Sequence, residues 1–275
     1  MSTYLNISDK IKLEAENPYL LENLGGAAIA YSLRLLDTSY TGNAITVTTN
    51  GSDSADIGFD GLGLDISSLE TFANGGDAYV SVWYDQSGNG NNATQTSFSA
   101  MPKIVSNGSV ILENKKPCIL YDGINDKFNL TTGVTSTDWS LFSVLNTDPS
   151  LPYGGILNSS GPGFIYHSSF GYNFRSDSYY RLIQNSDIGN SNHLIFFTVN
   201  SSTRNGYITD VDKYNYASVQ NESLVNNGYT FTQAFGEVFS GFYKGTSQEL
   251  IAYTSYKDGE QDLVMANGNK FYSIY

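Results

Sequence analysis

Short segments in which hydrophobic and polar residues alternate make up most of the chain after residue 40. The clearest is AYVSVWYD, at 78–85, whose even-numbered positions we expect on one side of a strand and whose odd-numbered positions on the other. Gly, Asn, Asp and Ser separate this run from further ones of the same kind: NAITVTT, SVILENKKPCILYDG, WSLFSVLNT, GGILNSS, GFIYHSS, GYNFRS, YYRLIQN, HLIFFTVN, RNGYITDV and SQELIAYTSY. Many short strands at this spacing predict an all-β protein, a two-sheet antiparallel sandwich.

Helical spacing is confined to a few short segments. AAIAYSLRLLD, at 27–37, has apolar residues that recur every three or four positions. DISSLETFAN, at 65–74, begins with a capping residue, Asp65 or Ser67, and is followed by two glycines that end a helix. The last segment, 258–275, predicts a short helix and an ordered tail. We therefore expect a few short helices beside the strands.

The first 25 residues differ in character from the rest of the chain. KIKLEAENPYLLENLGG is charged, is broken by Pro18 and ends in two glycines. We predict an N-terminal arm at 1–25, followed by a single domain at 26–275. The arm is interpreted either as a segment that attaches the protein to a partner or as a terminus with no docking role.

The charge of the chain excludes several classes of partner. The net charge is −13, and the 14 Lys and Arg residues are scattered. Nucleic-acid binding relies on clustered basic residues, so we expect no nucleic-acid partner.

No apolar run is long enough to span a membrane, and the start lacks a signal-peptide pattern. The single cysteine, Cys118, excludes an internal disulfide. We expect synthesis and folding in a reducing cytoplasm.

The loop DQSGNGNNATQT, at 85–96, carries the densest set of candidate ligands. Oxygens at positions 1, 3 and 5 followed by a glycine resemble the first half of a calcium loop, which would make Asp85, Ser87 and Asn89 ligands of a calcium ion. Position 12 is Thr96 instead of a bidentate Glu. A compact turn, in which the polar side chains bond backbone amides, is the favoured interpretation. No other cofactor is predicted.

The same region and the aromatic-rich second half also provide candidates for binding carbohydrate. Aromatic rings stack on sugar faces, and amide and carboxylate groups bond sugar hydroxyls. The candidates are Trp83, Asp85, Asn89, Asn91 and Tyr172. An ordinary sandwich core is the favoured interpretation of the aromatic residues.

Two carboxylates follow a predicted buried strand in YDGINDKF, at 121–128. Paired carboxylates such as Asp122 and Asp126 are typical of glycosidases, at separations of roughly 5–5.5 Å or 6.5–9.5 Å. Asp-Gly and Asn-Asp are equally typical of hairpin turns, and the turn is the favoured interpretation.

Several blocks resemble a known family in their order along the chain. The family is the concanavalin A-like (LamG-like) jelly-roll family related to the catalytic domain of fungal and bacterial α-L-arabinofuranosidase B. Similar domains occur in many bacteriophage virion proteins and in bacterial surface proteins. The resemblance is dense over 27–130, thin over 131–235, and returns near the C-terminus; it implies a jelly-roll sandwich. The blocks are AYSLRLLDTSYTGNAITV, DIGFD, VSVWYDQSGNGNNATQ, PKIVSNG, KKPCILYDGINDKF, GFYKGTSQELIAYTSY and FYSIY.

The catalytic motifs of the arabinofuranosidases are incomplete in this sequence. Members of the family carry a Glu nucleophile in an Asp-Met-Glu-Asn type motif, where NFRSDSYYRL offers only Asp177. They also carry vicinal cysteines, which a lone Cys118 does not provide. Their acid/base Asp follows a Gly-Gly pair, and AFGEVFSGFY places Glu237 there. The resemblance thus implies Glu237 and Asp177 as the residues of any remaining catalysis.

The sequence favours a non-catalytic jelly-roll protein displayed on a bacteriophage particle, as capsid decoration, head fibre or tail-associated protein. We expect it to bind host-surface glycans or other virion proteins, to form a homo-oligomer and to attach through its N-terminal arm. The expected location is the virion, with no membrane insertion. The alternatives are a glycoside hydrolase of arabinofuranosidase type and a bacterial surface-glycan binding protein.

Overall fold

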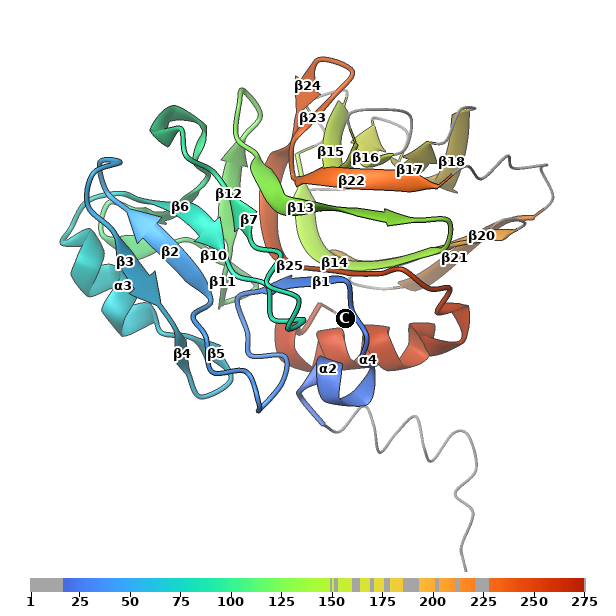
Figure 1. The fold of residues 1–275 in the computed structure, drawn as a ribbon, viewed down its shortest axis with the longest axis horizontal. Helices are drawn as coiled ribbons and strands as arrows, with labels where there is room; N and C mark the ends of the chain where they lie inside the picture. The colour runs from blue at the N-terminus through green and yellow to red at the C-terminus, as the bar shows by residue number, and fades with distance from the viewer. Residues whose placement is uncertain are drawn as a thin grey trace, which may run out of the picture.

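The computed structural model describes residues 17–148, 150, 153–159, 164–168, 171–175, 179–184, 193–200, 203–210, 213–220 and 228–274. Antiparallel strands make up most of the described part of the chain (Figure 1). The main sheet contains β1 (Ile29–Ser32), β2 (Ile45–Thr48), β3 (Ala55–Ile57), β6 (Ala78–Trp83), β7 (Ala93–Thr94), β8 (Lys103–Ser106), β9 (Ser109–Val110), β12 (Ile119–Asp122), β13 (Phe128–Ser136), β14 (Trp139–Thr147), β15 (Tyr153–Asn158), β16 (Phe164–Ser168), β17 (Gly171–Arg175), β18 (Tyr179–Gln184), β19 (His193–Val199), β20 (Thr203–Asp210), β21 (Lys213–Gln220), β22 (Tyr229–Ala234) and β25 (Lys244–Tyr253).

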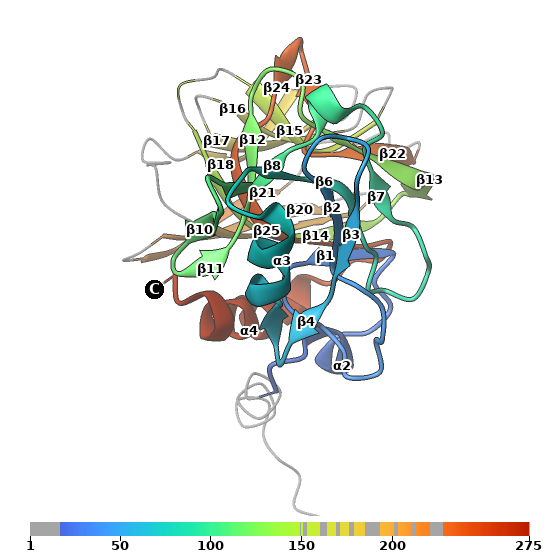
Figure 2. The ribbon, with the colours of Figure 1, turned by 90° about the vertical axis from the view of Figure 1, so that its left-hand side faces the viewer.

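Shorter elements complete the fold. Three two-stranded ribbons lie outside the main sheet: β4 (Phe59–Asp60) with β5 (Gly63–Leu64), β10 (Leu112–Glu113) with β11 (Lys116–Pro117), and β23 (Glu237–Val238) with β24 (Gly241–Phe242). The helices are α2 (Leu20–Asn23), α3 (Ile66–Ala73) and α4 (Gln261–Tyr272), with single 3-10 turns at Phe98–Ala100 and Asp258–Glu260. Helix α3 packs against β3, β8 and β9 (Figure 2).

Strand β25 is the centre of the sheet. It pairs with β14 along one edge and, along the other, with β12 and then β1. From β14 the sheet continues through β19 to β20 and β21, and from β12 it continues through β8 to β6. Strands β7, β13, β22 and β15 carry it back over β14 and β25, so one curled sheet forms both layers (Figure 1). The predicted all-β sandwich with few short helices is confirmed.

The segment predicted as a helix at 27–37 is strand β1 instead. Ile29 and Tyr31 belong to the core between the layers, while Ala30 belongs to a second cluster on the outer face. A strand buried on both faces has an unbroken apolar sequence, and periodicity does not separate it from a buried helix. The helices predicted at 65–74 and near the C-terminus are confirmed as α3, with Asp65 as N-cap, and α4.

Helices α2 and α4 cover the outer face of the β14, β19 and β25 region. Leu141 and Leu145 of β14 lie in the core between the layers, whereas Phe142 and Val144 lie in the cluster under the helices. Leu263 and Val264 of α4 belong to the same cluster. These strands therefore have apolar residues at nearly every position, as the runs WSLFSV and HLIFFTV reflect.

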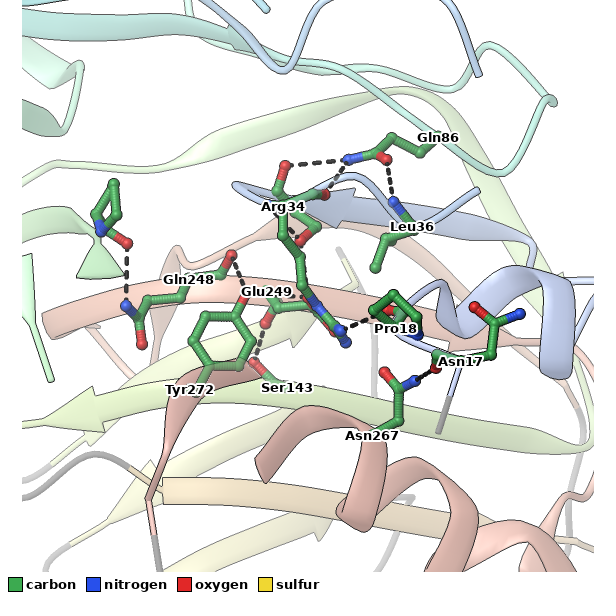
Figure 3. Close-up of polar contacts among 12 residues, drawn as sticks. Asn17, Pro18, Arg34, Leu36, Gln86, Ser143, Gln248, Glu249, Asn267 and Tyr272 are labelled. Atoms are coloured by element: carbon green, nitrogen blue, oxygen red, sulfur yellow. Dashed lines mark hydrogen bonds and ion pairs between the residues drawn. The ribbon is translucent and has the colours of Figure 1, made fainter. Parts of the chain in front are cut away.

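A buried ion pair joins the outer face of the sheet to both termini (Figure 3). Arg34 binds both oxygens of Glu249, with Nε–Oε2 at 2.8 Å and Nη2–Oε1 at 3.0 Å, and neither side chain is exposed. The Tyr272 hydroxyl of α4 donates to Glu249 Oε2 at 3.0 Å, and Arg34 Nη1 donates to the Pro18 carbonyl at 3.0 Å. Asn267 Nδ2 donates to the Asn17 carbonyl at 2.7 Å.

The described part of the predicted arm thus packs on the domain. Leu20, Leu21 and Leu24 are buried in the cluster under α2 and α4. Residues 1–16 lie outside the described residues, so the arm and its attachment role stay predictions. No helix in the described part of the chain is long and apolar enough to cross a membrane.

Candidate functional site

The polar loop that follows β6 binds neighbouring segments of the protein. Asp85 Oδ1 accepts hydrogen bonds from the backbone amides of Ala30 and Ser87, each at 2.9 Å. Asp85 Oδ2 accepts from the Asn91 amide at 3.0 Å and from the Ser87 hydroxyl at 2.8 Å. The side chain is only 4% exposed. All four bonds stay within the protein, so the carboxylate fastens the loop to β1.

The asparagines of the loop have the same role. Asn89 Nδ2 donates to the carbonyls of Ala27 at 3.0 Å and Ala28 at 3.1 Å. Asn91 accepts from the Thr132 amide and donates to the Thr132 carbonyl, both at 2.7 Å. The loop therefore fixes the segment before β1 on one side and β13 on the other. This is the compact, hydrogen-bonded turn that the sequence favoured.

The predicted calcium ligands do not fit a calcium ion in this arrangement. Both oxygens of Asp85 already accept two hydrogen bonds each, and Asn89 directs its Nδ2 to Ser87 Oγ at 3.0 Å. A calcium site needs six to eight converging oxygens. Among the described residues, no group of three or more His, Cys, Asp and Glu side chains is placed to hold a metal ion.

Four of the five predicted carbohydrate contacts lie in buried positions. Trp83 is fully buried, with its ring centroid 5.9 Å from Tyr31 and 6.2 Å from Phe128. Tyr172 is also fully buried, and its hydroxyl lies 3.1 Å from Thr147 Oγ1. Asp85 and Asn91 are buried as well, and Asn89 uses its amide within the protein. The four buried side chains build the core and its corner, whereas Asn89 is exposed on the loop.

The predicted catalytic residue Glu237 is exposed. It begins β23, and its carbonyl accepts a hydrogen bond from Asn158 Nδ2 at 3.1 Å. Within the described part of the chain its carboxylate makes no hydrogen bond or ion pair. Asp177 lies outside the described residues, so the pairing of Glu237 with Asp177 stays a prediction.

A cavity of about 530 Å³ opens near the turn between β12 and β13. Its volume lies in the range of small-molecule sites, roughly 300–1,000 Å³. The walls come from β6, the 3-10 turn at 98–100 with the residue that follows it, β8, β12 and the first residue of β25. The lining residues are Tyr79, Phe98, Ser99, Met101, Lys103, Leu120, Tyr121, Asp122, Asp126 and Lys244.

One wall of this cavity is apolar and partly open to solvent. Phe98 packs edge-on against Tyr79, with ring centroids 5.1 Å apart. Phe98 is 39% exposed and Leu120 is 38% exposed, which makes them two of the few exposed large hydrophobic side chains in the described part of the chain. Exposed aromatic rings of this kind provide flat apolar faces for a ligand.

The polar groups of the cavity come from the turn after β12. Asp126 Oδ2 accepts a hydrogen bond from the Asp122 amide at 2.9 Å, and Asp122 Oδ1 accepts from the Ile124 amide at 2.7 Å. Gly123 allows the turn by adopting a positive φ of 78°. The segment is thus the turn that the sequence favoured. The same geometry also brings both carboxylates to the cavity.

Burial makes Asp126 an unusual carboxyl. It is only 5% exposed, and this loss of solvent raises its pKa to about 6, with a smaller contribution from the charge of Asp122. The hydrogen bond from the Asp122 amide opposes the increase. Among the described residues, Asp126 Oδ1 has no hydrogen-bond partner. A carboxyl oxygen is therefore available beside the cavity.

The two lysines of the cavity are paired with carboxylates that do not line it. Lys103 Nζ lies 2.5 Å from Asp77, and Lys244 Nζ lies 2.8 Å from Asp148. In each pair the carboxylate offsets the positive charge of its lysine. Asp122 and Asp126 therefore dominate the charge of the cavity.

Sequence reasoning selected only the two aspartates of this site, and it assigned them to a turn. Tyr79, Phe98, Lys103 and Lys244 were not predicted as site residues. They come from segments far apart in the sequence that the curled sheet brings together. The available signal was the phenylalanine in the polar stretch TQTSFSAM, which has no place in an alternating strand.

Comparisons with known proteins agree with this fold. The sequence matches no family model and no curated protein. A mutant of a GH54 α-L-arabinofuranosidase soaked with 4-nitrophenyl α-L-arabinofuranoside is similar in structure, with a TM-score of 0.64 and 15% identity over 88% of this chain and 63% of that one. An arabinofuranosidase complexed with arabinofuranosyl-α-1,2-xylobiose has a TM-score of 0.58 and 14% identity over 91% of this chain and 65% of that one.

A weaker similarity extends to a Trypanosoma rangeli sialidase in complex with 2,3-difluorosialic acid. Its TM-score is 0.49, with 9% identity over 96% of this chain and 38% of that one. This chain spans less than two thirds of the length of each of these proteins. The arabinofuranosidase comparisons confirm the resemblance at the level of the fold: this chain has a β-rich fold similar to that of these two proteins.

Proposed function

We propose that this protein binds carbohydrate in the cavity beside the β12–β13 turn. The observation that carries the proposal is the meeting, in one cavity, of the exposed Phe98 ring with the buried Asp126 carboxyl and its available oxygen. A sugar presents C–H faces to an aromatic ring and hydroxyl groups to a carboxyl, so the two groups match its two kinds of surface. The fold shared with arabinofuranosidases supports the same class of ligand.

We further propose that binding takes place without hydrolysis. A retaining glycosidase needs two carboxyl groups facing each other at about 5–5.5 Å, and an inverting one needs about 6.5–9.5 Å. In this protein Asp126 Oδ2 accepts the Asp122 backbone amide and Asp122 Oδ1 accepts the Ile124 amide, so both carboxylates stabilise the turn, which favours a binding role.

A glycoside hydrolase of arabinofuranosidase type is the second candidate. The shared fold and the raised pKa of Asp126 favour it, because a carboxyl whose pKa is raised toward neutral is suited to general acid catalysis. In this candidate either Glu237 with Asp177 or Asp126 performs the chemistry.

A glycan array combined with a hydrolysis assay tests both candidates. The substrates are 4-nitrophenyl α-L-arabinofuranoside and arabinofuranosyl-α-1,2-xylobiose, each with and without calcium. We expect binding to glycans on the array, no turnover, and no effect of calcium. Phe98→Ala is expected to lower the affinity by about twofold to tenfold, which corresponds to the roughly 0.5–1.5 kcal/mol of an aromatic contact. Turnover that Glu237→Gln or Asp126→Asn abolishes would establish the hydrolase instead.

We also propose that the protein is displayed on a bacteriophage particle as a homo-oligomer, with glycans of the host surface as ligands and other virion proteins as neighbours. The resemblance of the motif blocks to virion proteins supports this location. Mass spectrometry of purified particles, beside particles that lack the gene, is the test. Particles without the protein that adsorb normally and keep intact capsids would contradict both virion roles. A gene neighbourhood without capsid or portal genes would favour a bacterial surface-glycan binding protein.

A further inference from the structure

We propose that the Asp126 carboxyl makes this cavity a site for neutral sugars, which rejects uronic acids at neutral pH and tolerates them in mild acid. This inference rests on the proposed carbohydrate function and adds to it the class of sugar and the response to pH.

The first argument is the balance of charge. Two aspartates and two lysines line the cavity, but Lys103 and Lys244 are bound to Asp77 and Asp148. Asp77 and Asp148 do not line the cavity, so carboxylates outside the cavity offset the charges of its two lysines. Asp122 and Asp126 keep their charge uncompensated, and a sugar carboxylate entering the cavity meets repulsion.

The second argument is the position of Asp126. Its side chain is 5% exposed, and one oxygen accepts the Asp122 amide while the other has no partner among the described residues. That second oxygen is not among the buried atoms that lack a partner, so a ligand can reach it, and a sugar hydroxyl can donate a charge-assisted hydrogen bond to it. The carboxylate of a uronate has no proton to donate to this oxygen and is repelled by its charge.

The third argument concerns which group changes charge between pH 5 and pH 8. The titratable groups around the cavity are Tyr79 of β6, Lys103 of β8, Tyr121 and Asp122 of β12, Asp126 of the turn and Lys244 of β25, while residues 98–101 contribute none. Burial raises the pKa of Asp126 to about 6 and raises the pKa of Tyr121 well above its ordinary value. Asp126 is thus the group placed to lose its charge in mild acid.

The experiment is a protein-observed NMR titration with matched pairs of methyl glycosides, at pH 7.5 and pH 5.0. The pairs are glucose with glucuronate, galactose with galacturonate, and mannose with mannuronate. At pH 7.5 we expect the neutral member of the bound pair to bind at least tenfold more tightly than the uronate. At pH 5.0 this ratio should decrease to about threefold or less. An unchanged ratio, or a uronate that binds at least as well at pH 7.5, would overturn the inference.

Variants locate the effect. Asp126→Asn keeps an acceptor for the Asp122 amide and should give the same low ratio at both pH values. Asp148→Asn releases Lys244 and should raise uronate affinity at pH 7.5. Asp60→Asn, in β4 outside the cavity, is the matched control and should behave like wild type. The wild-type pH response decides the question even if Asp126→Asn does not fold.

The outcomes separate this inference from the function beneath it. If no sugar of any pair binds at either pH and the glycan array is also silent, the carbohydrate proposal fails and this inference with it. If neutral sugars bind but the ratio does not respond to pH, only the inference fails.

Discussion

Individual residues determine how this protein responds to pH. Asp126 has a pKa of about 6 in the folded protein, against 3.8 as the ordinary value. The folded state therefore holds its proton more tightly than the unfolded state. Its stabilising contribution is complete below pH 3.8 and is lost as the pH rises through about 6.

We predict that Asp126→Asn removes this loss. The difference in unfolding free energy between the variant and wild type should shift in favour of the variant between pH 4 and pH 7, by an amount on the order of 1–3 kcal/mol. Urea denaturation at a series of pH values measures it.

Asp148→Asn provides a control of opposite sign. Lys244 and Ser150 lower the pKa of Asp148 to about 2, so its contribution is present at neutral pH and is lost in strong acid. The variant should lose less than about 1 kcal/mol at pH 7, because the pair is partly exposed. A pH-independent difference for Asp126→Asn would contradict the assigned pKa.

The buried pair of Arg34 and Glu249 is the polar contact whose loss we expect to lower the free energy of unfolding most. Arg34→Leu leaves the Glu249 carboxylate buried without its cation, and removing one partner of a buried pair costs about 3–5 kcal/mol. Chemical denaturation measures the loss. Replacing both residues, as in Arg34→Leu with Glu249→Leu, should recover part of it. A single variant as stable as wild type would mean that the pair is not formed in solution.

At the level of the elements, helix α4 lies unusually close to the sheet at Gly268. A Cβ atom there would lie 2.7 Å from the Phe142 ring. We predict that Gly268→Ala destabilises the protein by about 1–3 kcal/mol through overpacking, although alanine favours helices by about 1 kcal/mol. Gly259→Ala, where no atom lies within 4 Å of the added carbon, is the matched control and should be nearly neutral. Thermal melting of both variants decides between the two effects.

The alternation of residues in strand β6 did not predict correctly which side chains point into the core. Val80 and Trp83 are both buried, although they were expected on opposite sides of the strand. The pairing with β2 shifts between Thr46 and Val47, which face Val82 and Val80, so Ser81 is an extra residue on β6. A bulge of this kind moves the following residues to the other face, and it has no signature in the alternation itself.

The turns could be predicted because they depend on local sequence alone. Asp-Gly after β12 and Asn-Gly after α3 specify local backbone conformations that need little from the rest of the molecule. Both were recognised from the sequence. The helix expected at 27–37 was wrong because burial on both faces of β1 is decided by α2 and α4, which the local pattern does not contain.

At the scale of the whole molecule, the curled sheet determines which residues line the cavity. It brings β6, β8, β12 and the start of β25 to one cavity, from positions separated by up to 165 residues between Tyr79 and Lys244. No spacing rule in the sequence connects these segments. The strongest motif, the loop after Trp83, forms a hydrogen-bonded corner between the segment before β1 and β13.

The most direct test of this account is an NMR shift map of the protein with the glycan that binds most tightly on the array. We predict that the amides of residues 98–101 and 120–126 shift and that Phe98→Ala weakens the binding. Shifts confined to the β23–β24 ribbon around Glu237 would contradict this account. They would place carbohydrate binding beside Glu237, the residue that the family resemblance predicts as the acid/base.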